Sequence, residues 1–169
     1  MPFKIIHAEK KHILKDFCCG TPELDKYLKQ YAGQDLRRNL ATLFVAVEDG
    51  EDKVLGYYTL SNTGVSTQII PSSLRKKLPM YDDVPAIRIG RLAVDQSVQG
   101  QGLGARLLAN AVIMSISTVS AWALMVVDAK DEAACAFYGK FGFEALEDDE
   151  KHLFATRKNL EALFLVKSE

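Results

Sequence analysis

The stretch Gly90–Leu108, GRLAVDQSVQGQGLGARLL, decides how this chain folds. It continues an apolar run that begins at Ile87, and such a run suits a mostly buried strand. Glycines separated by single residues then predict a turn with almost no side chains, at Gly100, Gly102 and Gly104. From there apolar residues recur on one helical face, at Leu103, Leu107, Leu108, Ala111 and Met114. The stretch therefore predicts a strand, a glycine turn and a helix that the turn opens.

The glycine turn is suited to an anion. Its amides open a helix, where N–H groups have no intrahelical acceptor and the helix dipole is positive. Two familiar phosphate loops do not fit. Ala105-Arg106 stands where a Walker loop needs Lys-Ser/Thr, and the third glycine comes one residue early for a dinucleotide fingerprint. Taken alone, the turn is equally well interpreted as a plain connection between two elements, since short glycine patterns are common.

The composition indicates a single globular domain over residues 1–169. With 48% hydrophobic and 25% charged residues, the chain is long enough for one well-filled core. Its formal net charge of -1 excludes a global basic field, so nucleic-acid binding would need a local patch. Basic runs occur at Arg37-Arg38 and Arg75-Lys76-Lys77, and an acidic run at Glu147–Glu150. On composition alone, each run is best interpreted as a solvated surface.

Cysteines and histidines show no disulfide or metal pattern. Cys18, Cys19 and Cys135 are odd in number, and His7, His12 and His152 lie apart without ligand spacing. We therefore expect no metal and a reducing, cytoplasmic environment. No apolar signal region precedes the first elements, and the longest apolar run is far too short to cross a bilayer, so we expect no membrane association.

Hydrophobic periodicity and turn residues predict an α/β (α+β) domain with one mixed sheet. The expected strands are Pro2–Ile6, Ala41–Val47, Val54–Ser61, a further hairpin arm through Thr63–Ile69, Ala86–Val94, Trp122–Val127, Phe143–Leu146 and His152–Thr156. The expected helices begin at Thr21-Pro22, within Pro71–Leu78, at Leu103, after Asp131 with a stop at Gly142, and within Asn159–Phe164.

The helix after Asp131 carries a second motif. Residues 131–143, DEAACAFYGKFGF, follow the pattern Asn-x-x-Ala-x-x-Phe/Leu-Tyr-x-x-x-Gly-Phe, except that Asp131 replaces the asparagine. Gln99–Gly104 follows Gln/Arg-x-x-Gly-x-Gly/Ala. Together the two motifs resemble those of the GNAT superfamily of acyl-CoA-dependent N-acyltransferases. This resemblance implies a splayed central sheet with helices on both faces, and acetyl-CoA as the donor.

In GNAT enzymes the glycine loop holds the pyrophosphate of coenzyme A, and the first central strand pairs with pantetheine. The resemblance therefore implies these cofactor-binding residues: Leu92, Ala93, Val94, Gln99, Gly100, Gln101, Gly102, Leu103, Gly104, Ala105, Asp131 and Ala134. It also implies that Tyr138 is the catalytic acid, which gives a hydrogen bond or a proton to the departing thiolate. Without the resemblance, composition favours the interpretation of Tyr138 as an aromatic on the buried stripe of a helix. No general base stands out, and Glu48, Asp49, Asp83 and Asp95 qualify by residue type only.

Further residues look like those of the GNAT toxins of bacterial toxin–antitoxin modules. They are the pattern Phe17-x-Cys19-Gly20-x-Pro22-x-Leu24-Asp25-x-Tyr27-Leu28, the strands Gly56–Leu60 and Pro85–Asp95, and Leu153-Phe154. Such toxins acetylate the α-amino group of aminoacyl-tRNA, stop translation and are neutralised by a ribbon-helix-helix antitoxin. The resemblance thus implies aminoacyl-tRNA as substrate, such an antitoxin as partner, and a homodimer. The residues then expected to contact tRNA phosphates are Arg37, Arg38, Arg75, Lys76, Lys77, Arg88 and Arg91.

Two other functions remain open at this stage. One is a GNAT enzyme that acetylates a small-molecule or protein amine, with solvated basic runs. A cationic substrate would favour an acidic pocket, and acidic residues cluster only at Asp82-Asp83 and Glu147–Glu150. The other is an acyl-CoA-binding module without catalysis, which the presence of Tyr138 disfavours.

Overall fold

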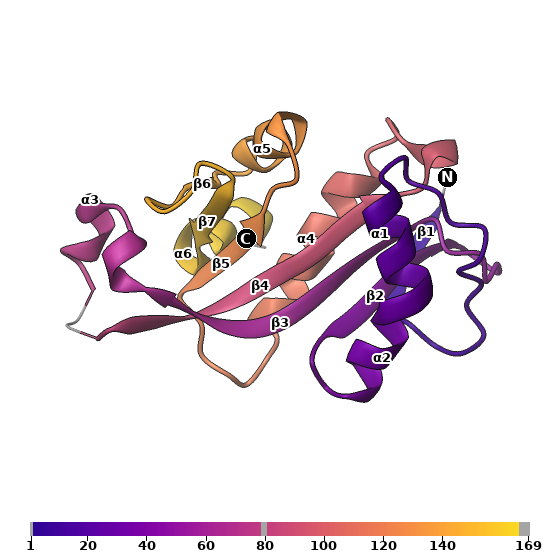
Figure 1. Ribbon diagram of the computed structural model, residues 1–169, viewed down its shortest axis with the longest axis horizontal. Helices are drawn as coiled ribbons and strands as arrows, with labels where there is room; N and C mark the ends of the chain where they lie inside the picture. The colour runs from indigo at the N-terminus through magenta and orange to yellow at the C-terminus, as the bar shows by residue number, and fades with distance from the viewer. Residues whose placement is uncertain (1, 79–80, 166–169) are drawn as a thin grey trace. The chain divides into compact units, whose positions relative to one another are not determined.

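A computed structural model describes residues 2–78 and 81–165. In these residues a seven-stranded sheet has the order β1-β2-β3-β4-β5-β7-β6 (Figure 1). The strands are β1 (Phe3–His7), β2 (Thr42–Glu48), β3 (Gly56–Ser66), β4 (Asp83–Val94), β5 (Leu124–Asp128), β6 (Glu144–Ala145) and β7 (His152–Thr156). β4 and β5 are parallel, whereas β1–β2, β2–β3, β5–β7 and β6–β7 are antiparallel. The sheet is therefore mixed, and the predicted α+β class is confirmed.

The α-helices are α1 (Pro22–Lys26), α2 (Ala32–Arg37), α3 (Ser72–Arg75), α4 (Leu103–Ile116), α5 (Glu132–Gly139) and α6 (Arg157–Phe164). Single turns of other types are η1 (Tyr27–Tyr31), η2 (Thr67–Ile69) and η3 (Gln96–Val98). In the part of the chain that the structure describes, no helix combines the length and apolar character needed to cross a membrane.

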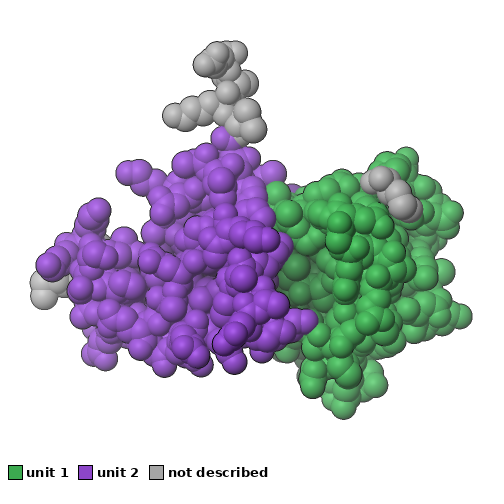
Figure 2. All heavy atoms as spheres, turned by 90° about the horizontal axis from the view of Figure 1, so that it is seen from above, with its two compact units in different colours: residues 1–61, 90–111 green, residues 62–89, 112–169 purple. Residues whose placement is uncertain are grey.

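The chain divides into two compact units, which Figure 2 shows in different colours. Unit 1 holds residues 1–61 and 90–111, and unit 2 holds residues 62–89 and 112–169. Strands β3 and β4 and helix α4 each contribute residues to both units.

The core of unit 1 packs the first helical segments on β2 and β3. The Tyr57 ring is fully buried, meets the edge of Phe17 at 5.5 Å, and its hydroxyl donates to Leu24 O at 2.7 Å. A Cβ atom at Gly56 would lie only 3.0 Å from Leu107 Cδ1, so α4 packs directly against the start of β3. This close packing positions the helix that follows the glycine turn.

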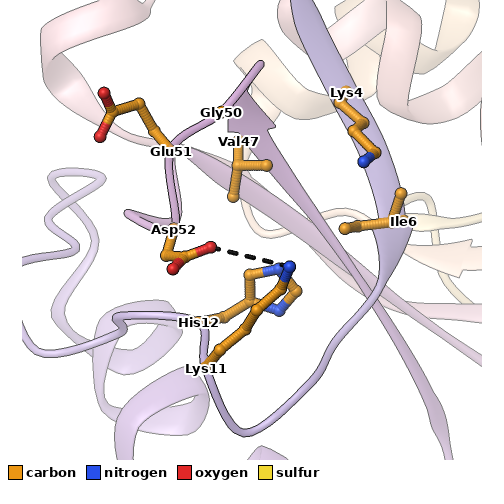
Figure 3. Close-up of a pocket in the computed structure, with 8 residues that line it drawn as sticks. All are labelled: Lys4, Ile6, Lys11, His12, Val47, Gly50, Glu51 and Asp52. Carbon is orange, nitrogen blue, oxygen red and sulfur yellow. Dashed lines mark ion pairs between the residues drawn. The ribbon is translucent and has the colours of Figure 1, made fainter.

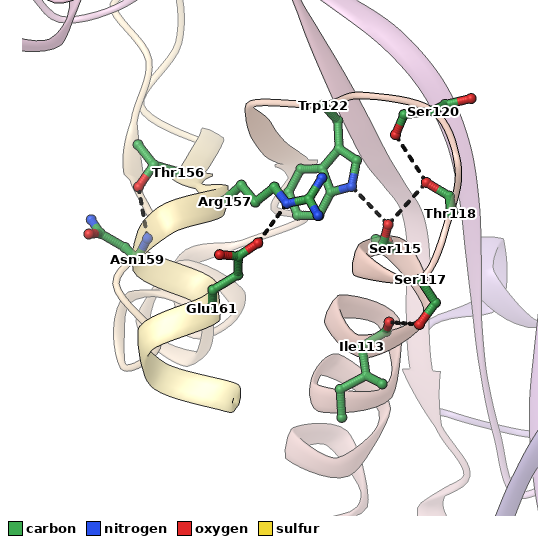
Figure 4. A network of polar contacts seen from close by, with 10 residues as sticks. All are labelled: Ile113, Ser115, Ser117, Thr118, Ser120, Trp122, Thr156, Arg157, Asn159 and Glu161. Carbon is green, nitrogen blue, oxygen red and sulfur yellow. Dashed lines mark hydrogen bonds and ion pairs between the residues drawn. The ribbon is translucent and has the colours of Figure 1, made fainter. Parts of the chain in front are cut away.

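The core of unit 2 joins β4, β5 and β7. Its buried residues are Val65, Ile70, Val84, Ala86, Leu124, Val126, Leu146 and Phe154. Beside it, Trp122 Nε1 and Thr118 Oγ1 both donate to Ser115 O, at 2.8 and 3.1 Å (Figure 4). The Arg157 guanidinium lies 4.9 Å from the Trp122 ring and pairs with Glu161 at 2.7 Å. These contacts fix the end of α4 and the start of α6.

Several elements differ from expectation, among them the continuation of β3 and the strand at Trp122, and β4 begins at Asp83 and not at Ala86. The hairpin arm expected through Thr63–Ile69 is wrong, because β3 continues without a turn to Ser66, and a single 3-10 turn follows. Asn-Thr-Gly at 62–64 resembles a turn, yet these residues lie within β3, and Val65, which follows them, is buried in the core. The strand expected at Trp122 begins two residues later, because the Trp122 indole is bound to Ser115 O.

Candidate active site

The glycine turn of unit 1 has open space around its backbone. Gly100 and Gly102 adopt φ of +79° and +81°, which favour glycine, and a Cβ atom at either would meet nothing within 4 Å. The Arg106 amide donates to the carbonyl of Gly102, the residue just before α4, at 3.2 Å. The amides of Leu103–Ala105 come before it and have no intrahelical acceptor. Backbone donors, open space and a helix N-terminus together suit a pyrophosphate.

Gln99, the first residue of the loop motif, is turned toward the protein. Its side-chain nitrogen donates to Cys19 O and Val94 O, both at 2.9 Å. The backbone amide and the side-chain oxygen of Gln99 are left to interact with a ligand. The side chain therefore fastens the loop to the end of β4.

Residues Leu92–Val94 lie beyond the ladder that joins β4 to β5. That ladder runs from Ala86–Leu124 to Ile89–Val127, while β4 continues to Val94. Gly90 has no room for a side chain, since a Cβ atom would lie 2.6 Å from Thr59 Oγ1, which accepts from the Arg91 amide at 3.1 Å. This irregularity is of the kind that a β-bulge produces.

Tyr138 lies on α5 in unit 2. It is 5% exposed and packs edge-on against Phe137 and Phe143, at centroid distances of 5.1 and 5.4 Å. Its hydroxyl makes no hydrogen bond within the described residues. Burial raises the pKa of Tyr138, so the phenol stays protonated near neutral pH and is available as a donor.

Asp131 is the N-cap of the same helix, as predicted. Its Oδ1 accepts from the Ala134 amide at 2.8 Å, which satisfies one of the unpaired donors of α5. The carboxylate thus does locally what the asparagine of the motif would do, although it lacks an amide donor for a ligand.

The Asp95 carboxylate is bound by donors of the protein itself. Its carboxylate accepts from the Cys18 amide at 2.9 Å, the Ser97 amide at 2.9 Å and Ser97 Oγ at 2.7 Å. Burial by itself would raise the pKa of Asp95, but these hydrogen bonds, helped by the charge of Lys53, hold it below its ordinary value. Asp49 and Asp83 are exposed, and Glu48 lines an open cavity.

The basic residues of unit 1 differ in how they are held. Arg37 and Arg38, at the end of α2, are exposed. The Arg91 guanidinium instead lies 3.6 Å from the centroid of the Tyr27 ring, and Tyr27 donates from its hydroxyl to Asp35 at 2.7 Å. Burial and that hydrogen bond raise the pKa of Tyr27 to about 12. This cation–π contact with Tyr27 orients the Arg91 guanidinium before any ligand arrives.

The basic residues of unit 2 fall into three states. Arg75 donates to Ile70 O through Nε and Nη2, at 3.2 and 2.9 Å, and pairs with Glu147 at 3.5 Å. Lys76 and Lys77 are exposed. Arg88 is half-buried on β4, and its buried Nε has no partner in the described residues.

Two cavities are lined by described residues of unit 1. One of about 360 Å³ borders the glycine turn through Gln101 and is also lined by Glu48, Glu51, Lys53, Leu55, Ser97 and Val98. The other, of about 120 Å³, contains no residue of the turn (Figure 3). There His12 Nδ1 accepts from the Glu9 amide at 2.8 Å, and Lys11 approaches Asp52 at 3.9 Å.

Sequence reasoning missed the residues that support the turn, namely the segment Cys18–Gly20 and the carboxylate of Asp95. One signal was present, because an aspartate directly after a strand commonly accepts from the amide two residues later, as Asp95 does from Ser97.

The sequence model of the acetyltransferase (GNAT) domain matches residues 39–145. The chain belongs to the GNAT acetyltransferase family. It is 36% identical over 150 residues to the "tRNA-acetylating toxin" of Mycobacterium tuberculosis (strain ATCC 25618 / H37Rv), an alignment that covers 87% of each chain.

Two solved structures extend this relationship to other GNAT proteins. The toxin AtaT complexed with acetyl-methionyl-tRNAfMet has a TM-score of 0.86 and 34% identity, with 96% of this chain and 99% of that chain covered. A tyrosine-to-phenylalanine mutant of AtaT, bound to the C-terminus of the antitoxin AtaR and acetyl-CoA, has a TM-score of 0.81 and 27% identity, with 98% and 100% covered.

Proposed function

We propose that this GNAT chain is a toxin that transfers the acetyl group of acetyl-CoA to the α-amino group of aminoacyl-tRNA and so blocks translation. The observation that carries the proposal is the 36% identity to a tRNA-acetylating toxin over 87% of both chains. The complex of AtaT with an acetylated aminoacyl-tRNA supports the same substrate class.

The glycine turn fits the donor. We place the pyrophosphate of acetyl-CoA against the backbone of Gln99–Ala105, because the turn offers unpaired amides and space where side chains would otherwise stand. Pantetheine would pair with Leu92–Val94, the part of β4 outside its ladder with β5. Asp131 and Ala134 remain candidates at the start of α5.

Acetyl-CoA supplies an acetyl group activated as a thioester. The neutral α-amino nitrogen attacks the carbonyl carbon, a C–N bond forms, the C–S bond breaks with its electron pair leaving on sulfur, and the nitrogen releases a proton to water. Tyr138 would donate a hydrogen bond to that sulfur. Because burial raises the pKa of a phenol that is already a weaker acid than a thiol, stabilisation of the thiolate by hydrogen bonding outweighs full proton transfer.

No general base is required by this scheme. The amine of an aminoacyl ester is acidic enough to be partly neutral in the cell. The commitment of Asp95 to three donors agrees with a reaction that uses no carboxylate base.

We place tRNA phosphates on the basic residues of both units: Arg37, Arg38, Arg75, Lys76, Lys77, Arg88 and Arg91. Arg91 and Arg88 are the strongest candidates. Arg91 is preoriented on Tyr27, and Arg88 is half-buried without a protein acceptor. Arg75 is already bound to Ile70 O and Glu147, which leaves it less free for a ligand.

The remaining parts of the proposal concern assembly. We propose a ribbon-helix-helix antitoxin, a homodimer, a cytoplasmic location and one GNAT domain over residues 1–169. The structure of an AtaT mutant with the C-terminus of the antitoxin AtaR supports an antitoxin as the protein partner. Two strands and one helix that contribute to both units support a single domain.

The test is transfer of label from acetyl-CoA to a bulk pool of charged tRNA. We expect label on the aminoacyl group, which alkaline release from tRNA would recover as N-acetyl amino acids. Binding of acetyl-CoA without labelled aminoacyl-tRNA would overturn the substrate and favour a small-molecule or protein amine. Binding without transfer to any amine would indicate a module that lacks catalysis.

A further inference from the structure

The chain just before the glycine turn is tied to a distant segment of unit 1. Asp95, directly after β4, accepts from the Cys18 amide at 2.9 Å. One residue later the Gln96 amide donates to Cys18 O at 2.8 Å. The two bonds, one to the Asp95 side chain and one between backbones, hold Asp95 and Gln96 against Cys18, a residue far away in sequence.

Two further groups extend this contact toward the turn. Asp95 Oδ1 accepts from the Ser97 amide and hydroxyl, at 2.9 and 2.7 Å, which closes η3 as a capped turn. Gln99 donates from its side chain to Cys19 O and Val94 O, both at 2.9 Å. The backbone is therefore fixed on both sides of η3, up to the residue before Gly100.

Gly20 permits the close approach. Its φ is +94°, and a Cβ atom there would lie 2.8 Å from Gln96 Nε2. A side chain at this position would need a strained backbone and would displace Gln96. The Cys-Cys-Gly sequence at residues 18–20 therefore has a structural reason that composition does not suggest.

Asp95 is the central group of this arrangement. It is 5% exposed, and its carboxylate oxygens face the Cys18 amide, the Ser97 amide and Ser97 Oγ. Hydrogen bonds to a buried carboxylate are stronger than those between neutral groups, and the loss of the charge leaves two amides poorly satisfied.

A loop that binds pyrophosphate through backbone amides loses affinity when its conformation must be ordered on binding. We infer that Asp95 is a positioning residue for acetyl-CoA, which holds Gln96–Gln99 and the Cys18–Gly20 segment together so that the glycine turn is preformed. The inference rests on the proposed acetyl-CoA site, and it assigns Asp95 no contact with the ligand.

The experiment is calorimetric binding of acetyl-CoA to the full chain, compared among wild type, Asp95→Asn and the control Asp16→Asn. The control removes the same charge from an exposed residue next to the segment. We expect a dissociation constant raised at least about tenfold in Asp95→Asn and unchanged in the control. Ser97→Ala, which removes one hydrogen bond of the set, should raise it about two- to fivefold.

Kinetics separate positioning from general damage. At saturating acetyl-CoA, Asp95→Asn should recover the kcat of wild type while its KM for acetyl-CoA stays raised. The inference would be overturned if kcat of Asp95→Asn fell as much as its KM rose. It would also be overturned if Asp95→Asn bound acetyl-CoA with wild-type affinity. If Asp95→Asn does not fold, Ser97→Ala and Gly20→Ala decide, and wild-type affinity in both would overturn it as well. Failure of wild type to bind acetyl-CoA would instead refute the proposed site itself.

Discussion

The two units hold their predicted site residues in opposite ways. In unit 1 the glycine turn is supported by part-buried hydrogen bonds that involve Asp95 and Gln99, and open space surrounds the backbone of Gly100 and Gly102. In unit 2 the Tyr138 hydroxyl and the buried Nε of Arg88 make no hydrogen bond within the described residues. On the proposed function, unit 1 offers acetyl-CoA a preformed backbone, whereas Tyr138 and Arg88 gain their partners, the CoA sulfur and a tRNA phosphate, only when the substrates bind.

The largest expected effect is on unit 2. Tyr138→Phe removes the proposed thiolate donor, and general acid groups contribute about 10²–10⁴-fold in rate. We expect kcat for acetylation of charged tRNA to fall within that range, while the affinity for acetyl-CoA, measured by calorimetry, is unchanged. A wild-type rate in the variant would remove Tyr138 from the chemistry.

The next largest effect is expected in unit 1, where a substitution should change the KM for acetyl-CoA and not kcat. Gly102→Val puts a β-branched side chain at a φ of +81°, which costs about 1–2 kcal/mol, and fills the space left for phosphate. We expect the KM for acetyl-CoA to rise at least about tenfold. The control is Gly139→Ala, at a helical glycine with open space around it, and it should leave the KM for acetyl-CoA unchanged.

A pair of half-buried arginines in unit 2 tests the assignment of Arg88. Arg88→Met should raise the KM for aminoacyl-tRNA about tenfold, as expected for a lost charged hydrogen bond, without loss of stability, because no protein partner is abandoned. Arg157→Met should leave that KM unchanged and lower the free energy of unfolding by about 1 kcal/mol, because contacts with Glu161 and Trp122 are lost. Urea unfolding measures the stability of each variant, and titration with aminoacyl-tRNA measures its KM. A loss of stability in Arg88→Met together with a raised KM in Arg157→Met would contradict the comparison.

Acid should weaken the support of the turn. The pKa of Asp95 lies below its ordinary value of 3.8, so its stabilisation is present in full above that value and is lost as the pH falls through the lower folded pKa. We expect the difference in unfolding free energy between wild type and Asp95→Asn to be constant near neutrality and to shrink below about pH 4. A difference independent of pH would show that the charge of Asp95 is not what stabilises the fold.

The smallest effect concerns the exposed lysines. Lys76→Ser and Lys77→Ser should each weaken tRNA binding a fewfold, whatever the aminoacyl group, and reduce the slope of log affinity against log salt by about 1. Lys10→Ser is the matched control, because it removes an exposed lysine from unit 1 that has no proposed contact with tRNA. An unchanged salt slope would place Lys76 and Lys77 outside the tRNA contact.

Local sequence signals predicted most of the fold. Periodicity located α4, the α5 cap at Asp131 and the closing hairpin of β6 and β7. Local signals failed at Asn62–Gly64. These turn-forming residues lie within strand β3, and Val65, which follows them, is buried in the core.

The site shows a similar limit. Gly100, Gly102 and Tyr138 are visible as motifs, because their spacing is local. The link from Cys18 to Asp95 joins residues far apart in sequence, so no periodicity reveals it. The free state of Arg88 and the bound state of Arg75 likewise depend on tertiary neighbours, although both read as basic residues in the sequence.

The most direct measurement is single-turnover acetyl transfer to charged tRNA by wild type, Gly102→Val and Tyr138→Phe, each at saturating acetyl-CoA. Since the donor site and the chemical step are separate in this account, Gly102→Val should recover close to the wild-type rate at saturation, and Tyr138→Phe should remain slow. Recovery by Tyr138→Phe, or no transfer to aminoacyl-tRNA even by wild type, would contradict it.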